Sequence, residues 1–155
     1  MHQIFKGFIE SLEPSFLCLM RMEPVTVATL PRKMPNSGIY LFSEDDKHFY
    51  VGRSNTIKKR LQKHCRPSSG HNSATFAFRV ARQLTGNVDA TYTKIGSRPE
   101  LEKNPEFLSV FIKQKTRIRN MNVRFVSEPE PMRQALLEMY VSVSLGTLYN
   151  DFDNH

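Results

Sequence analysis

The stretch Gly-Ile-Tyr-Leu-Phe-Ser-Glu-Asp-Asp-Lys-His-Phe-Tyr-Val-Gly-Arg, residues 38–53, decides the fold of this 155-residue chain. Residues 38–43 and 48–53 are rich in β-branched and aromatic side chains, which favour strands. The polar residues 44–47 between them are typical of a tight turn. The stretch therefore predicts a β-hairpin with two adjacent strands.

Helical and strand patterns follow the hairpin along the chain. Residues 122–126 alternate like a strand, and apolar side chains recur at helical spacing in three segments. The three segments are residues 56–65, 73–84 and 105–119. A last helix is expected to begin at Glu130-Pro131 and to stop at Gly146, because proline suits a first helical turn and glycine a C-cap. Residues 86–99 carry no decisive pattern, and the order of elements indicates an α/β (α+β) fold.

The segment before the hairpin is interrupted by prolines. Apolar spacing predicts a short helix over residues 2–12. Pro14, Pro24, Pro31 and Pro35 then predict that residues 13–37 form an extended arm, with a strand-like run at 25–27.

Basic residues outnumber acidic ones by 22 to 15, and they are concentrated in two stretches that contain no Asp or Glu. The stretches hold Arg53, Lys58, Lys59, Arg60, Lys63 and Arg66, and Lys113, Lys115, Arg117, Arg119 and Arg124. Such stretches in a small domain suggest a polyanionic partner, most simply nucleic acid. A basic surface that only confers solubility is the alternative.

The cysteines and the apolar runs limit the cellular compartments in which the chain is expected. Cys18 and Cys65 have no metal-ligand or redox spacing, so a reducing, cytoplasmic compartment is the default expectation. The most apolar run near the N-terminus, residues 16–20, is far shorter than the roughly 20 residues that span a bilayer. Glu10 and Glu13 precede this run, which argues against a signal peptide. No membrane partner is expected.

Tyr40 and Tyr50 lie on the two paired strands of the predicted hairpin. Cross-strand neighbours on one face approach within about 5 Å, so the two hydroxyls can converge. A free tyrosine has a pKa of about 10, and a nearby arginine or metal cation would favour the phenolate that can act as a base. Packing alone is the alternative, since tyrosine is common in strands.

Two glycines bracket the tyrosines. A glycine inside a strand usually marks a bulge or a close approach of the backbone. Gly38 follows Asn36-Ser37 and can be explained as a turn residue. Gly52 lies within the second strand, where its missing side chain would leave room for a ligand.

Arg60 and His64 are one helical turn apart, on a helix whose other face holds Ile57 and Leu61. The sequence therefore predicts that Arg60 and His64 share an exposed face. The planar guanidinium suits a phosphate, and the imidazole can donate to a phosphate oxygen or hold a water. A solvated basic helix is the alternative.

Further polar residues stand in chemically suggestive places. Glu138 is the only acid in the apolar stretch 134–141, where it is either a surface residue or a ligand for a hard cation. Asn150 follows the C-cap glycine, where asparagine commonly supports a turn. Residues 70–73 precede a helix whose N-terminus could hold a phosphate, or they supply its N-cap through Asn72 or Ser73.

Taken together, these residues resemble the GIY-YIG nuclease superfamily. The two halves of the name motif read here as Gly38-Ile39-Tyr40 and Tyr50-Val51-Gly52, with valine as a conservative departure from isoleucine. The later positions of the family match, in order and spacing, Arg60, His64, Glu138 and Asn150.

The resemblance implies a small three-stranded antiparallel sheet flanked by helices. It also implies that residues 1–35 form a separate N-terminal helix and arm, and that residues 36–155 form the nuclease-like domain. The stretch of about residues 86–121 is longer than a minimal family core needs and is expected to add a basic helix around 100–120 that could contact DNA.

The resemblance further implies hydrolysis of DNA phosphodiester bonds with one divalent cation, Mg²⁺ or Mn²⁺, bound by Glu138. The implied catalytic residues are Tyr40, Tyr50, Arg60, His64, Glu138 and Asn150. The candidates for contact with double-stranded DNA are Gly52, Arg53, Lys59, Lys63, His71, Arg79, Lys115 and Arg117. A binding module that does not cleave, and a toxin or effector nuclease, are the alternative functions. The choice between a monomer and a homodimer stays open.

Overall fold

The computed structural model describes residues 1–87 and 96–152, and the chain divides into two compact units. Unit 1 comprises residues 1–58 and 122–150, and unit 2 comprises the described residues of 59–121 and 151–155. Residues 88–95, within the stretch to which the pattern assigned no element, lie outside the described residues. The division between a 1–35 segment and a 36–155 domain stays a prediction.

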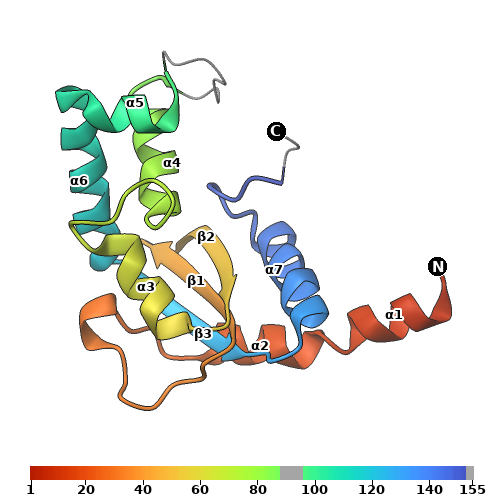
Figure 1. Ribbon diagram of the computed structural model, residues 1–155. Coiled ribbons are helices and arrows are strands. Elements are labelled where there is room, and N and C mark those ends of the chain that lie inside the picture. The colour runs from red at the N-terminus through yellow and green to blue at the C-terminus, as the bar shows by residue number, and fades with distance from the viewer. Residues whose placement is uncertain (88–95, 153–155) are drawn as a thin grey trace. The chain divides into compact units, whose positions relative to one another are not determined.

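The predicted hairpin is confirmed in unit 1. Strand β1 (Gly38–Glu44) pairs antiparallel with strand β2 (Lys47–Ser54), as Figure 1 shows. Asp45 and Asp46 join the strands with φ of 50° and 62°. Positive φ at both central residues matches the twist of the flanking strands, and aspartate tolerates this conformation better than most residues.

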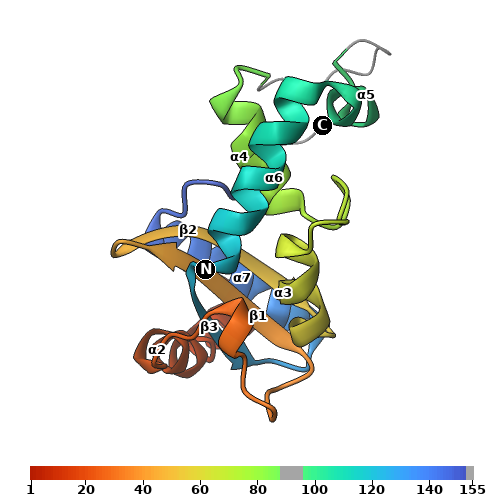
Figure 2. The same cartoon turned by 90° about the vertical axis from the view of Figure 1, so that its left-hand side faces the viewer.

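The three-stranded antiparallel sheet is also confirmed. Strand β3 (Asn122–Ser127) pairs antiparallel with β1, which gives the strand order β2-β1-β3 (Figure 2). The central strand β1 is buried along nearly its whole length. The sheet therefore depends on β1 for both of its pairings, and β2 forms one edge.

Helix α7 (Pro131–Leu145) begins and ends as predicted. The Glu130 side chain accepts hydrogen bonds from two backbone N–H groups in the first turn, and Gly146 ends the helix with φ of 59°. Leu137 and Val141 of this helix are buried in one apolar cluster with three side chains of the hairpin. The three are Ile39, Leu41 and Val51. Because side chains alternate along a strand, α7 covers the face of the hairpin opposite to the tyrosines.

The predicted extended arm over residues 13–37 is wrong for its first part. After helix α1 (Gln3–Glu10), residues Glu13–Arg21 form a second helix, α2. Pro14 lies in the first turn of α2, where its missing N–H removes no helical hydrogen bond. Leu19 of α2 is buried in the apolar cluster of the hairpin, and this burial stabilises the helix.

The strand-like run at residues 25–27 is reduced to one bridge. Val25 pairs with Val123 outside the named strands, and residues Val27–Thr29 form a 3₁₀ turn, η1. This bridge and α2 lie beside β3 (Figure 2).

Unit 2 is helical. Its elements are α3 (Ile57–Cys65, in unit 2 from Lys59 onward), α4 (Thr75–Leu84), α5 (Arg98–Lys103) and α6 (Pro105–Arg119). Helices α3, α4 and α6 were predicted from apolar spacing, whereas the short α5 was not. Helices α4 and α6 lie side by side, with the Phe78 ring centroid 5.1 Å from that of Phe107 and 5.3 Å from that of Phe111 (Figures 1 and 2).

The predicted N-cap of α4 is wrong. Helix α4 begins after Ala74, with no side-chain cap. The backbone N–H groups of Ser73 and Ala74 donate instead to the Gly70 carbonyl, so a backbone turn replaces the Asn72 or Ser73 cap.

Within residues 1–87 and 96–152, no helix combines the length and the apolar character needed to cross a membrane.

We predict that Gly38→Ala destabilises the protein by about 2–4 kcal/mol. Gly38 has φ of 154°, and a Cβ there would lie 1.9 Å from the Val126 carbonyl oxygen, so β3 would have to move. Gly7→Ala is the matched control, because nothing lies within 4 Å of its added Cβ and alanine favours the α1 helix. The free energy of unfolding in urea measures both effects. Equal stability of Gly38→Ala and wild type would contradict the proposed close contact.

Candidate functional site

The tyrosine pair lies on one face of the hairpin in unit 1. The strand register places Tyr40 opposite Gly52 and Tyr50 opposite Phe42, so the two tyrosines are diagonal neighbours. Their ring centroids are 6.4 Å apart. Tyr40 is buried and Tyr50 is half-buried.

Gly52 is required by the Tyr40 ring. A Cβ at Gly52 would lie 2.4 Å from the Tyr40 hydroxyl oxygen, so the ring fills the space that a side chain would take. That space is therefore not open for a ligand, and a role of Gly52 in substrate binding stays a prediction. The absence of a side chain instead lets the Tyr40 hydroxyl reach from the central strand across to the edge strand β2.

Arg53 follows Gly52 and pairs with the predicted metal ligand. Its Nε lies 3.1 Å from Glu138 Oε2, which joins the end of β2 to the middle of α7. Burial raises the pKa of the Glu138 carboxyl above its ordinary value, and the Arg53 guanidinium opposes part of that rise. By alternation along β2, Arg53 points to the face covered by α7 and Tyr50 to the opposite face.

Glu138 has the chemistry of a ligand for a hard cation. Within the described ranges, no three His, Cys, Asp or Glu side chains gather in a group that could hold a metal ion. Mg²⁺ often takes only one or two protein carboxylates and keeps several waters or substrate phosphate oxygens. A single half-buried carboxylate fits that pattern and does not fit a structural zinc site.

Asn150 binds the backbone of the second tyrosine motif. Its Nδ2 donates to the Val51 carbonyl (2.7 Å), and its Oδ1 accepts from the Val51 N–H (2.9 Å). The backbone N–H of Tyr149 donates to the Phe49 carbonyl (2.9 Å), so residues 149–150 run along the outer edge of β2. Since its amide pairs with both backbone groups of Val51, Asn150 is a positioning residue for the strand that carries Tyr50 and Gly52.

Arg60 and His64 belong to unit 2, and the prediction that they share an exposed face is wrong. The Arg60 guanidinium donates to the Ser73 carbonyl (3.0 Å) and to the Thr75 hydroxyl (3.1 Å), which ties α3 to the start of α4. His64 and Leu61 are fully buried, and Cys65 is buried. Burial lowers the pKa of His64 well below its ordinary value, and Arg60 adds to that shift, so the imidazole is neutral near pH 7.

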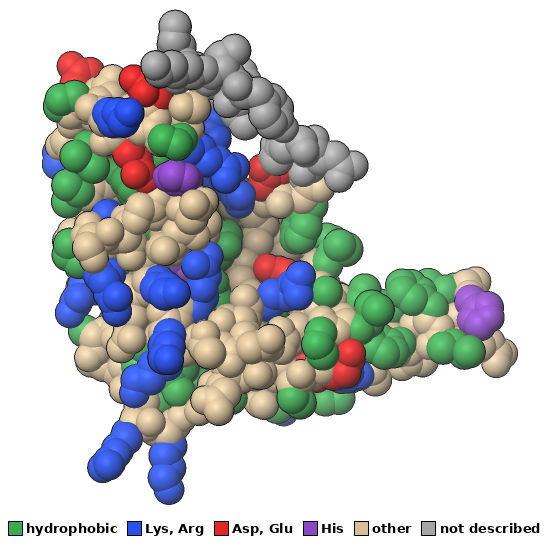
Figure 3. Space-filling model, viewed as in Figure 1, with side chains coloured by type: hydrophobic (Ala, Val, Ile, Leu, Met, Phe, Trp, Pro, Cys, Tyr) green, Lys and Arg blue, Asp and Glu red, His purple; other side chains and the backbone are tan. Residues whose placement is uncertain are grey.

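Other predicted DNA contacts differ in exposure. Lys59 and Lys63 are exposed, and Lys and Arg side chains gather over α3 in Figure 3. The Arg117 guanidinium donates to Gln114 Oε1 (3.3 Å). Arg79 lies 4.0 Å from the Asp151 carboxylate. The two lysines are therefore the better candidates for contact with a polyanion.

Lys115 was predicted to contact DNA. In the structure it has a structural role instead. Its ammonium is buried and donates to the carbonyls of Pro67 (2.6 Å) and Ser69 (2.9 Å). It also lies 4.4 Å from the Phe111 ring centroid. Burial lowers the pKa of Lys115. The α6 pattern concealed this role, because a lysine with a long apolar stem can occupy a helix face of either kind.

His71 has a partner that the sequence pattern missed. Its Nδ1 lies 2.9 Å from Glu102 Oε1, and its backbone N–H donates to the same oxygen. Glu102 belongs to α5, the helix that apolar spacing did not predict. Contact of His71 with DNA stays a prediction.

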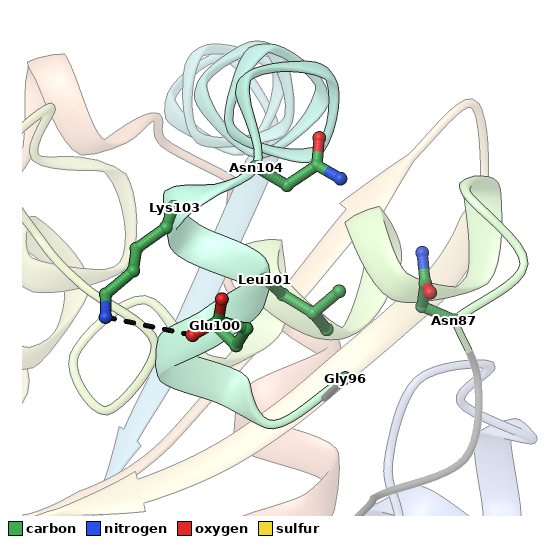
Figure 4. Close-up of a pocket in the computed structure, with 6 residues that line it drawn as sticks. All are labelled: Asn87, Gly96, Glu100, Leu101, Lys103 and Asn104. Carbon is green, nitrogen blue, oxygen red and sulfur yellow. Dashed lines mark ion pairs between the residues drawn. The ribbon is translucent and has the colours of Figure 1, made fainter. Parts of the chain in front are cut away.

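Unit 2 contains a pocket of about 340 Å³. Figure 4 shows the residues that line it. The pocket is lined by Asn87, Gly96, Glu100, Leu101, Lys103 and Asn104. An ion pair of 3.7 Å joins Lys103 to Glu100 at its side. None of the lining residues was predicted to take part in function, so the pocket is not the candidate site.

Comparison with known proteins identifies the class of the domain. Residues 36–104 match the family model of the GIY-YIG catalytic domain, which confirms the resemblance seen in the motifs. The match includes both tyrosine motifs, Arg60 and His64, and it ends before Glu138 and Asn150. The GIY-YIG domain indicates a nuclease family, whose substrate is nucleic acid. No curated protein and no solved structure matches the chain.

We predict that His64→Gln flattens the loss of stability on acidification. The buried His64 resists protonation, whereas the unfolded chain takes up a proton as the pH falls through about 6.5. Wild-type stability should therefore fall below about pH 6.5, by up to about 1.4 kcal/mol per pH unit from this residue. Urea unfolding at several pH values between about 5 and 7 measures the slope.

His2→Gln is the control for this slope, because His2 is exposed. His48, whose pKa is lowered by burial and by Arg124, is present in wild type and in both variants. Its contribution to the slope of stability against pH is therefore the same in each. An identical slope in His64→Gln and wild type would exclude a neutral, buried His64.

Proposed function

We propose that this protein is a metal-dependent endonuclease that hydrolyses phosphodiester bonds in double-stranded DNA. One observation supports this most: Gly52 lets the Tyr40 hydroxyl reach the edge strand, and the next residue, Arg53, contacts the Glu138 carboxylate. Adjacent residues of β2 thus serve the proposed base on one face of the strand and, through Arg53, the proposed cation ligand on the other.

In the proposed reaction, one tyrosine takes a proton from the attacking water. Tyr40 is the proposed base and Tyr50 its partner, and the two roles can be exchanged, since Tyr50 is the more exposed of the two. The second tyrosine would tune the first through the shared face of the hairpin. Asn150 would keep the strand between Tyr50 and Gly52 in place through its two bonds to Val51.

Glu138 is proposed to hold one Mg²⁺ or Mn²⁺. When bound, the cation would supply positive charge that stabilises the added negative charge of the phosphate and the leaving oxygen. Glu138 lies on α7, whose neighbouring Leu137 is fully buried, so the carboxylate is carried by a rigid element.

Arg60 and His64 are assigned from their place within the matched family domain. Arg60 would stabilise negative charge in the transition state, since its guanidinium stays charged and donates in parallel. His64 is buried and neutral, so the role of orienting the phosphate or the water would require its side chain to become accessible when DNA binds. The exposed Lys59 and Lys63 would contact the DNA backbone, which positions DNA without reading its sequence.

A binding module that does not cleave is the competing function, because the exposed basic side chains would serve it equally well. Nicking of a supercoiled plasmid in Mg²⁺ or Mn²⁺, abolished by EDTA, is expected for the nuclease. DNA binding without nicking in either metal would favour the module. A cytoplasmic location remains part of the proposal, consistent with Cys18 and Cys65 being free thiols.

We predict that Arg60→Lys lowers the cleavage rate by about 10²–10³-fold, since an ammonium cannot reproduce the guanidinium's parallel donors. Thr75→Val is the matched control, because it removes the acceptor of one Arg60 hydrogen bond and keeps the arginine. It should cleave near the wild-type rate. Single-turnover nicking, with thermal unfolding to verify the fold, separates a chemical role from a structural one. Wild-type cleavage by Arg60→Lys would refute the assignment.

We predict that Glu138→Gln loses metal-stimulated cleavage and keeps its DNA affinity in EDTA. Glutamine retains the size of the side chain and an oxygen that can accept from Arg53, but it lacks the charge that a divalent cation needs. Plasmid nicking and fluorescence anisotropy of a labelled duplex measure the two properties. Retained stimulation by Mg²⁺ would point to another ligand.

A further inference from the structure

We propose that Arg53 and the divalent cation compete for Glu138. In the metal-free protein Arg53 binds the carboxylate, and cation binding releases the guanidinium to a phosphate of the DNA. This inference rests on the proposed function, because it assumes that Glu138 is the metal ligand. It adds a means by which loading of the metal and binding of the substrate depend on each other.

The contact itself is direct and lies wholly within unit 1. Arg53 Nε is 3.1 Å from Glu138 Oε2, so the guanidinium already occupies an oxygen that a cation would need. A half-buried position strengthens the repulsion between an arginine and a divalent cation at the same carboxylate. The two positive groups therefore compete for the carboxylate.

The exposed fractions of the two side chains indicate which partner moves. The Arg53 side chain is 48% exposed, whereas that of Glu138 is 20% exposed. An arginine this exposed loses little when its ion pair opens, because water hydrates the released charge. Glu138 stays in place, since Leu137 and Val141 of the same helix are buried in the core.

The released guanidinium has a natural partner. Arg53 lies on the edge strand β2 and its side chain is 48% exposed, so the released guanidinium is accessible to a phosphate of bound DNA. Guanidinium and phosphate form parallel, charge-assisted hydrogen bonds. The exchange replaces an arginine–carboxylate pair by a cation–carboxylate pair and an arginine–phosphate pair, so every charge keeps a partner.

Binding of Mn²⁺ without DNA tests the competition. Mn²⁺ titrations followed by electron paramagnetic resonance at about pH 8 should show roughly two- to fivefold tighter binding to Arg53→Gln than to wild type. Arg53→Lys keeps the competing charge and should stay close to wild type. Arg32→Gln, which removes an equal charge from the exposed loop before β1, should also stay close to wild type. Unchanged or weaker binding by Arg53→Gln would overturn the proposal.

The Glu138→Gln variant distinguishes failure of the competition between Arg53 and the cation from failure of the proposed metal site. If Glu138→Gln binds Mn²⁺ as tightly as wild type, the metal site itself is misassigned and the competition falls with it. If Glu138→Gln loses Mn²⁺ while Arg53→Gln binds it like wild type, the metal site stands and only the competition is excluded.

A second measurement tests the release toward DNA. Because linkage is reciprocal, a cation that frees Arg53 must strengthen DNA binding through that residue. Anisotropy of a labelled duplex in Ca²⁺ and in EDTA should show a larger gain in affinity for wild type than for Arg53→Gln. An equal gain in both proteins would overturn the transfer of Arg53 to a phosphate.

Discussion

The antiparallel pairing of β1 with both β2 and β3 is the constraint on which the rest of unit 1 depends. Gly38 approaches the β3 backbone so closely that a side chain there would meet the Val126 carbonyl. Gly52 admits the Tyr40 ring onto β2 in the same way. Both glycines of the motif therefore have a packing reason. That of Gly52 also has a chemical consequence, because it lets the hydroxyl of Tyr40 on the central strand reach the edge of the sheet.

The edge strand β2 is held from outside the hairpin. Asn150 pairs with both backbone groups of Val51, and Glu138 pairs with Arg53, so two segments from the end of the chain meet one short strand. Placement of Tyr50 thus depends on residues about a hundred positions downstream. Loss of either segment would loosen the strand even where the tyrosines themselves are intact.

Basic residues in this chain serve two different purposes. Lys59 and Lys63 are exposed, whereas Lys115 is buried and donates to two carbonyls of unit 2. Charge counted along the sequence cannot separate these cases, because lysine stems pack as well as apolar side chains do. The net charge therefore overstates the surface that a polyanion can contact.

Local pattern alone determined the hairpin, its Asp45-Asp46 turn and the helix ends at Glu130 and Gly146, since these depend on neighbours within a few residues. The family resemblance also came from the sequence, through the order and spacing of motif residues between Gly38 and Asn150. Helix α2 was missed because Pro14 was taken to interrupt the chain, whereas proline is tolerated in the first turn and Leu19 is buried in the core. The burial of His64, the diagonal placement of Tyr40 and Tyr50, and the pairs Arg53–Glu138 and His71–Glu102 came only from the tertiary structure. The physical reason is that burial and long-range pairing join residues far apart in the chain, which no spacing along the sequence records.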